Sequence, residues 1–374
     1  MCRNFEAGTI LVIRDKLNQL GVKVYKWVAM RRTLLPRFIE VETTKACNLR
    51  CPGCRRNYSE GSIYTEPGEQ HLTVGALWRI VATTPVMLLR FEGDGEPLTN
   101  PNFGELVKFC HSHGIRSTMT SNGTLIDEGW TKFLESHGMV RIHVSFDGAT
   151  KDTYERTKLG ADYERTFDNC KRIGDSKIQL FMNVVLFSDE VVEELPKYVE
   201  QAKKVGATGI HCMKIQQDSL DFGTPPDLLQ HENALGKFRN YARWAGLQLV
   251  GTYSNQPTFV RCYDPFTSPF ALLNNDVYAC TYMANLRRTE VYQGEVFPVP
   301  YQNYRMGNLE DDWMKDIWRN DAYEELRATL KEDAKAYSGS VASPEVIVEG
   351  KKLVTGLRFS FCNFCLCQWG ESGL

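Results

Sequence analysis

Short β-rich runs alternate with longer amphipathic stretches between residues 38 and 214, and this alternation limits the folds open to the chain. Such a pattern predicts parallel β/α units, because consecutive parallel strands need a helical crossover between them. The count of runs fits a (β/α)6 partial barrel of α/β class better than a closed eight-stranded barrel or a flat open sheet. Ligands are then expected at the carboxyl ends of the strands. The predicted strands are 38–43, 86–92, 115–120, 139–146, 178–187 and 208–214, and the predicted helices are 73–83, 101–113, 126–137, 151–173 and 190–205.

Three cysteines follow the first predicted strand directly, in the run Cys47-Asn-Leu-Arg-Cys51-Pro-Gly-Cys54. Three thiolates on one short loop can hold three irons of a 4Fe–4S cubane, which leaves the fourth iron without a protein ligand. A small molecule can chelate that open iron. The alternative is a zinc site, which requires a fourth ligand, and none of the seven histidines lies near this loop at a suitable spacing.

Polar and glycine-rich segments stand at the ends of the following strands. Hydroxyl, amide and carboxylate groups in such places can contact a ligand, and the alternative is that they cap the next helix. The segments are Gly93-Asp94-Gly95-Glu96-Pro97, Ser121-Asn122-Gly123-Thr124 and Ser145-Phe146-Asp147-Gly148, followed by Tyr154 to Gly160 with Lys158, then Asn183 on the fifth strand and His211 and Lys214 on the sixth.

A second set of cysteines lies beyond a Pro- and Gly-containing connection. Cys262 and Cys280 flank a predicted hairpin that turns at Asn274 to Asp276, and the chain ends in Cys362-Asn-Phe-Cys365-Leu-Cys367. Two pairs brought together supply four thiolates, which saturate either a second cubane or a zinc ion. The remaining cysteines are scattered and are interpreted as ordinary small apolar residues: Cys2, Cys110, Cys170 and Cys212.

Together these segments resemble the motifs of the radical S-adenosylmethionine (radical SAM) superfamily. The resemblance implies a partial barrel over 36–215, a 4Fe–4S cluster on Cys47, Cys51 and Cys54, and S-adenosylmethionine on the open iron. Lys158 stands where the family branch with extra clusters has an arginine that pairs with the cofactor carboxylate. Gly53 stands where the family usually has an aromatic residue, which predicts looser packing over the adenine. The residues expected to bind the cofactor are Gly93, Asp94, Gly95, Glu96, Ser121, Asn122, Ser145, Asp147, Lys158 and Asn183.

The C-terminal part resembles the twitch module, a shortened SPASM domain. Gly307-Asn308-Leu309 and Ile317-Trp318 match its connecting segments, so that Cys262, Cys280, Cys362 and Cys365 are expected to hold one auxiliary 4Fe–4S cluster. Cys367 lies outside this set of four ligands. It is expected to be inert, to substitute for one of the ligands, or to donate a hydrogen atom to a substrate radical. We predict four regions: a helical cap over 1–35, the barrel over 36–215, a connecting helix and strand over 216–257, and the cluster module over 258–374.

Composition limits the classes of function and the cellular location expected for the chain. The 374-residue chain has a net charge of −2, which argues against a general nucleic-acid or membrane-surface role. It has no apolar run of membrane-spanning length and no signal-peptide pattern, so a cytoplasmic protein is expected.

The expected function is removal of a hydrogen atom from an unactivated C–H bond, with the auxiliary cluster accepting an electron, as in dehydrogenation of a sugar or aminocyclitol. Lys158 and Cys367 are the expected catalytic residues, and the expected partner is a flavodoxin or ferredoxin-type reductant. Maturation of a ribosomal peptide, aided by a discrete peptide-recognition protein, is the first alternative, and a non-enzymatic iron–sulfur sensor is the second. The stretch 338–355, with a hairpin at Glu349-Gly350, is expected either to cover the substrate or to decorate the surface.

Overall fold

The computed structural model describes residues 34–54, 56, 70–214, 226, 230–251, 264–284, 289–292, 295–298, 305–336, 345–348 and 351–354. The predicted N-terminal cap lies outside these residues except for its last two positions. The described residues also leave out Cys262, Cys362, Cys365 and Cys367, so the auxiliary ligand set, with Cys367, stays a prediction there.

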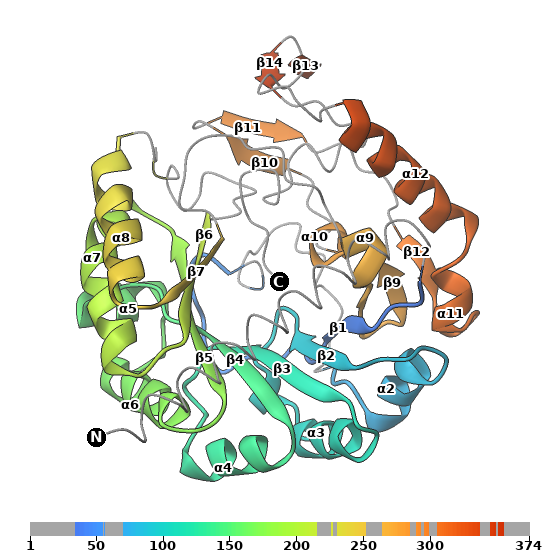
Figure 1. The fold of residues 1–374 in the computed structure, drawn as a ribbon, viewed down its shortest axis with the longest axis horizontal. Coiled ribbons are helices and arrows are strands. Elements are labelled where there is room, and N and C mark those ends of the chain that lie inside the picture. Colours follow the sequence, from blue (N-terminus) through green and yellow to red (C-terminus); the bar gives the residue numbers. More distant parts are fainter. Residues whose placement is uncertain are drawn as a thin grey trace, which may run out of the picture.

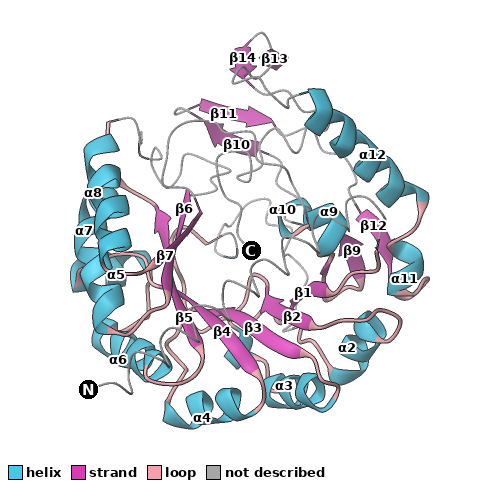
Figure 2. Cartoon of the chain, in the orientation of Figure 1, coloured by secondary structure: helices cyan, strands magenta, loops and turns pink. Residues whose placement is uncertain are grey.

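One ten-stranded sheet organises the described chain, in the order β12-β9-β8-β1-β2-β3-β4-β5-β6-β7. Neighbours from β8 to β7 run parallel, whereas β9 is antiparallel to β8 and β12 is antiparallel to β9. The sheet curves, with the helices of the β/α units around its outer side (Figure 1 and Figure 2). The predicted strands are β1 (Phe38–Glu42), β2 (Leu88–Glu92), β3 (Arg116–Ser121), β4 (Met139–Ser145), β5 (Gln179–Leu186) and β6 (Gly209–Lys214).

The helices follow the predicted order, with one difference. Residues 151–173 form two helices, α5 (Lys151–Thr157) and α6 (Tyr163–Gly174), rather than one. Gly160 has a φ of +94°, which few other residues adopt, and the Asp162 carboxylate caps α6 by accepting from the Arg165 N–H. The others are α2 (Val74–Val81), α3 (Phe103–Ser112), α4 (Glu128–Ser136), α7 (Asp189–Lys204) and α8 (Glu232–Trp244).

Strands from beyond residue 215 extend the sheet at both edges. The connecting strand β7 (Gln248–Gly251) pairs with β6, and β8 (Phe270–Ala271) pairs with β1. β8 and β9 (Asp276–Tyr278) form the predicted hairpin, in which Asn275 has a φ of 68°. The rest of the C-terminal part comprises α9 (Asp264–Thr267), α10 (Thr281–Ala284), β10 (Thr289–Tyr292), β11 (Glu295–Pro298), β12 (Arg305–Asn308), α11 (Met314–Ile317), α12 (Asp321–Ala336), and the hairpin predicted around 349–350, β13 (Glu345–Val348) with β14 (Lys351–Val354).

The core lies between the sheet and the helices. Ile39 and Val41 of β1 are buried on the outer face of the sheet, and α2 buries Leu77 and Ile80 against that side. Because side chains alternate along a strand, residues 38, 40 and 42 face the opposite, inner side. The helices therefore hold the sheet from outside and leave the strand ends and the inner face for chemistry. Among the described helices, none is long and apolar enough to cross a membrane.

Candidate active site

The cysteine loop follows the end of β1 and is hydrogen-bonded to three other segments of the chain. The Ala46 carbonyl accepts hydrogen bonds from the Glu96 N–H at 2.8 Å and from the Thr99 hydroxyl at 2.9 Å. The Asn48 amide donates to the Thr124 hydroxyl at 2.9 Å, and the Arg50 N–H donates to the Leu159 carbonyl at 3.0 Å. The predicted motifs after β2, β3 and β4 therefore meet at this loop, as strand ends of one sheet should.

The three cysteine thiols are half-buried and lie in a tight turn, where the Cys54 N–H donates to the Cys51 carbonyl at 3.1 Å. Asn122 Nδ2 approaches Cys47 Sγ at 3.9 Å. Burial raises the pKa of Cys51 to about 11, against the opposing charge of Lys158, and burial also raises the pKa of Cys54. Three sulfur donors on one tight loop fit a metal cluster, and a bound cation would offset the cost of burying them as thiolates.

Gly53 lies against an aromatic ring from another part of the chain. A Cβ atom at Gly53 would lie 2.7 Å from Cε2 of Phe187, the residue after β5. The space beside the third cysteine is therefore filled by an aromatic ring that comes from another part of the chain, and the packing over the adenine stays a prediction.

The segment after β2 packs its backbone against the cysteine loop. A Cβ atom at Gly95 would lie 2.2 Å from the Thr44 carbonyl oxygen and 2.4 Å from that of Ala46. Gly93 has a φ of +111°, and a Cβ there would meet the Glu42 side chain at 2.7 Å. Both glycines are thus required by close approach, as their place in the motif predicts. Asp94 lies between them, at the same strand end.

Glu96 joins the ends of β2 and β3. Its Oε1 accepts from the Ser121 hydroxyl at 2.8 Å and from the Leu98 N–H at 3.3 Å, and its Oε2 accepts from the Asn122 N–H at 2.6 Å. Burial raises the pKa of Glu96 to about 7, although these hydrogen bonds oppose the shift. Protein donors therefore engage both oxygens, and the predicted contact with a cofactor ammonium group stays a prediction.

Asn122 is placed to order the cysteine loop. Its Nδ2 donates to the Asn48 side-chain oxygen at 2.9 Å, while its Oδ1 accepts from the N–H of Thr124 at 3.0 Å. Asn48, between the first two cysteines, was not among the predicted site residues. Its role follows from contacts between residues about 75 positions apart, which local spacing does not reveal.

The predicted lysine lies in a buried ion pair. Lys158 Nζ is 2.7 Å from Asp147 Oδ2, and Asp147 Oδ1 accepts from the Val185 N–H at 2.7 Å. The lysine and aspartate side chains are 13% and 9% exposed. Burial opposes the charge on Lys158, but Asp147 and Cys51 outweigh it and raise the lysine pKa. A permanent cation therefore stands beside the cysteine loop, where it can meet a carboxylate.

Ser145 and Asn183 face each other across β4 and β5. The Asn183 Oδ1 lies 3.0 Å from His143 Nδ1, and the Asn183 carbonyl accepts from the N–H of Phe146 at 2.9 Å and from the hydroxyl of Tyr198 at 3.1 Å. The predicted cofactor residues on the described chain thus gather at one edge of the sheet. Contact of each with a cofactor stays a prediction.

The C-terminal module presents one described cysteine. Cys280 is buried two residues after the end of β9, with its Sγ accepting from the Met283 N–H at 3.4 Å. The next residue, Thr281, donates its hydroxyl to Glu40 on β1. The Leu309 carbonyl accepts from Arg79 Nε of α2 at 3.0 Å, so the predicted Gly307-to-Leu309 segment also packs on the barrel.

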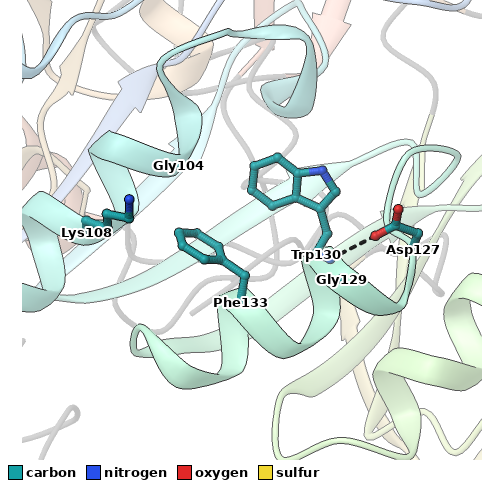
Figure 3. Close-up of a pocket in the computed structure, with 6 residues that line it drawn as sticks. All are labelled: Gly104, Lys108, Asp127, Gly129, Trp130 and Phe133. Carbon is teal, nitrogen blue, oxygen red and sulfur yellow. Dashed lines mark hydrogen bonds between the residues drawn. The ribbon is translucent and has the colours of Figure 1, made fainter.

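A groove of about 380 Å³ lies elsewhere, over α3 and α4 on the outer side of the sheet (Figure 3). None of the predicted site residues lines it. Its walls are Gly104, Lys108, Asp127, Gly129, Trp130 and Phe133.

Comparison with known families matches residues 41–202 to the radical SAM superfamily and residues 262–339 to the SPASM iron–sulfur cluster-binding domain. An AdoMet-dependent heme synthase from Methanosarcina barkeri is 26% identical over 87% of this chain and 92% of its own length. The heme synthase of Nitratidesulfovibrio vulgaris is 21% identical over 76% of this chain and 78% of its own.

Among solved structures, Streptococcus suis SuiB bound to S-adenosylmethionine matches with a TM-score of 0.61 at 14% identity, over 82% of this chain and 71% of SuiB. At that identity the likeness shows a shared fold. The predicted fold class and cofactors are confirmed: the two domains imply S-adenosylmethionine, its 4Fe–4S cluster and further iron–sulfur in the C-terminal part. The chain therefore contains a radical SAM domain followed by an iron–sulfur cluster-binding domain of the SPASM type.

Proposed function

We propose that this protein is an oxidoreductase that takes a hydrogen atom from an unactivated C–H bond of a small molecule. The bound cluster and S-adenosylmethionine supply an adenosyl radical, and the protein holds the substrate against it and excludes water. The observation that carries the proposal is the meeting of the three-cysteine loop with the motifs after β2, β3 and β4 at one sheet edge.

Each residue set has a proposed role. Cys47, Cys51 and Cys54 hold three irons, and Lys158, oriented by Asp147, binds the cofactor carboxylate. A net oxidation also requires that the substrate radical release one proton and give up one electron. Cys280, tied to β1 through Thr281, belongs to the site that accepts it, together with Cys262, Cys362 and Cys365.

We propose an alcohol or amine-bearing ring, such as a sugar or aminocyclitol, as the substrate class. A tetrapyrrole is the second candidate, because the similarity to heme synthases extends over 87% of the chain rather than over the barrel alone. Peptide maturation with a separate recognition protein is the third. We further propose a cytoplasmic setting and reduction by a flavodoxin or ferredoxin-type protein.

The test is formation of 5′-deoxyadenosine by the anaerobically reconstituted, dithionite-reduced enzyme. Replacing Cys47, Cys51 and Cys54 by alanine should abolish it, and retained cleavage would refute the front-cluster assignment. Replacing Cys280 and Cys365 should preserve cleavage but abolish the oxidised product. A wild-type enzyme that carries both clusters yet neither binds nor cleaves S-adenosylmethionine would instead support the iron–sulfur sensor.

A further inference from the structure

The inner face of the sheet is polar, whereas the interiors of β/α barrels are commonly filled by branched apolar residues. Successive strands place Glu40, Arg90, Thr118 and Arg141 in one row. The next row, nearer the strand ends, includes Glu92, Thr120, His143 and Phe181. Polar residues in these positions need partners, either from the protein or from a ligand.

Most of this polar face is satisfied by the protein itself. Arg90 lies 3.2 Å from Glu40 and 3.5 Å from Glu92, and Glu92 also accepts from the Thr120 hydroxyl at 3.2 Å. Arg141 donates to the Gln179 side-chain oxygen at 2.9 Å. Arg90 is therefore paired with two carboxylates, and Arg141 with a neutral amide.

His143 differs from these neighbours. Its Nδ1 lies 3.0 Å from the Asn183 side-chain oxygen, an acceptor, so Nδ1 carries the hydrogen and Nε2 has a lone pair. Nε2 is buried and has no hydrogen-bond partner among the described residues. The ring is fixed by stacking on Phe181, at 5.2 Å between centroids, and by the edge of His211 at 5.9 Å.

The surroundings keep this imidazole neutral. Burial, followed by the positive charge of Arg90, holds the pKa of His143 well below its usual range. Burial likewise lowers the pKa of His211 to about 4. The result is a rigid, uncharged acceptor two residues before Ser145, one row below the strand ends where the cofactor is expected.

We propose that His143 Nε2 accepts a hydrogen bond from a hydroxyl or amino group of the substrate, and that the substrate is a neutral or amine-bearing polyhydroxy compound. A lone pair recognises a donor, and leaving a buried acceptor unpaired costs about 1–3 kcal/mol, which such a ligand restores. The carboxylates of an ionised polycarboxylate offer this lone pair no donor. The inference rests on the proposed function and specifies its substrate class.

The experiment uses the holoenzyme with S-adenosylmethionine and dithionite. Three probes are added separately: myo-inositol, glucosamine and coproporphyrin III. The readout is 5′-deoxyadenosine formed above the background without a probe. We expect stimulation by at least one of the first two and none by coproporphyrin III. Stimulation by the tetracarboxylate alone, or by no probe while background cleavage persists, would overturn the assignment.

Two variants then test His143 itself. His143→Gln keeps an acceptor near the Nε2 position, whereas His143→Asn keeps only a group near Nδ1. We expect kcat/KM for the stimulating probe to fall about 10- to 100-fold in His143→Asn, mainly through KM, and to recover within a few-fold in His143→Gln. Equal values for both variants, or no loss in His143→Asn, would refute the contact.

His111→Gln, on the exposed side of α3, is the matched control and should leave stimulation unchanged. Cleavage of S-adenosylmethionine without a probe tells a failure of the proposed function apart from a failure of the His143 inference. Wild-type enzyme with loaded clusters and no 5′-deoxyadenosine at all would refute the proposed function. Normal background cleavage, combined with stimulation by coproporphyrin III alone or by no probe, would refute the His143 inference alone.

Discussion

Gly95→Ala tests whether the motif after β2 supports the cysteine loop by close backbone contact. The added Cβ would stand 2.2 Å from the Thr44 oxygen and 2.4 Å from the Ala46 oxygen. Contacts below 3.0 Å are essentially never made by a Cβ atom, so one backbone segment must move by roughly 1 Å. Both obstructing atoms are backbone, so no side-chain rotation can relieve the overlap.

The movement should weaken the hydrogen bond from the Glu96 N–H to the Ala46 carbonyl, which is 2.8 Å long. Overpacking of this kind costs about 1–3 kcal/mol, and the residue after Ala46 is the first cluster ligand. We therefore expect the unfolding midpoint to fall by roughly 1–4 °C and iron incorporation at the front site to drop. Scanning calorimetry of the apoprotein and iron analysis after reconstitution measure the two effects.

Gly75→Ala is the matched control. Gly75 lies in α2, and the nearest atom to its added Cβ is the Thr73 hydroxyl at 4.0 Å. This substitution should stabilise the protein by roughly 0.5–1 kcal/mol, because alanine favours a helix over glycine. If Gly95→Ala matched Gly75→Ala in both stability and iron content, the close approach would not be a constraint and the reasoning would be refuted.

Three further predictions concern buried charges. Arg327→Ala should lower the free energy of unfolding by about 2–4 kcal/mol, because the buried Arg327 guanidinium donates to backbone carbonyls and lies 4.2 Å over the Trp318 ring. A loss below about 1 kcal/mol in urea unfolding experiments would contradict this prediction. Burial raises the pKa of Glu42 from 4.5 to about 7, so its protonated form stabilises the fold fully below about pH 4.5. That contribution of roughly 3 kcal/mol is lost as the pH rises from 4.5 through 7. Glu42→Gln should therefore flatten the decline in stability between pH 5 and 8, and an unchanged slope in denaturant titrations would exclude this origin. Asp147→Asn should weaken S-adenosylmethionine binding to the oxidised holoenzyme about 5- to 50-fold, since Lys158 loses the partner that orients it, and an unchanged Kd by calorimetry would argue against the pair.

The sequence predicted the barrel strands to within two residues because each strand is a compact run bounded by turn residues. It also placed the cofactor motifs correctly at one edge, since parallel strands bring their carboxyl ends together. The break at Gly160 was missed, although Leu-Gly before Ala-Asp carries the signal of a helix end followed by a cap. Phe187 over Gly53 could not be predicted, because nothing local connects positions 134 residues apart.

Strand β1 explains how two cysteine-bearing regions distant in sequence become one unit. Its end leads into the loop of Cys47, while its other edge pairs with β8, whose hairpin leads to Cys280. Glu40 reinforces this link, because it accepts from Thr281 on one side and pairs with Arg90 on the other. Both ends of the proposed electron route are thus fixed to a single strand with hydrogen-bonded neighbours on both edges. The separation between the front site and the Cys280 region is therefore set by the sheet rather than by a flexible linker, which favours the proposed electron transfer between them.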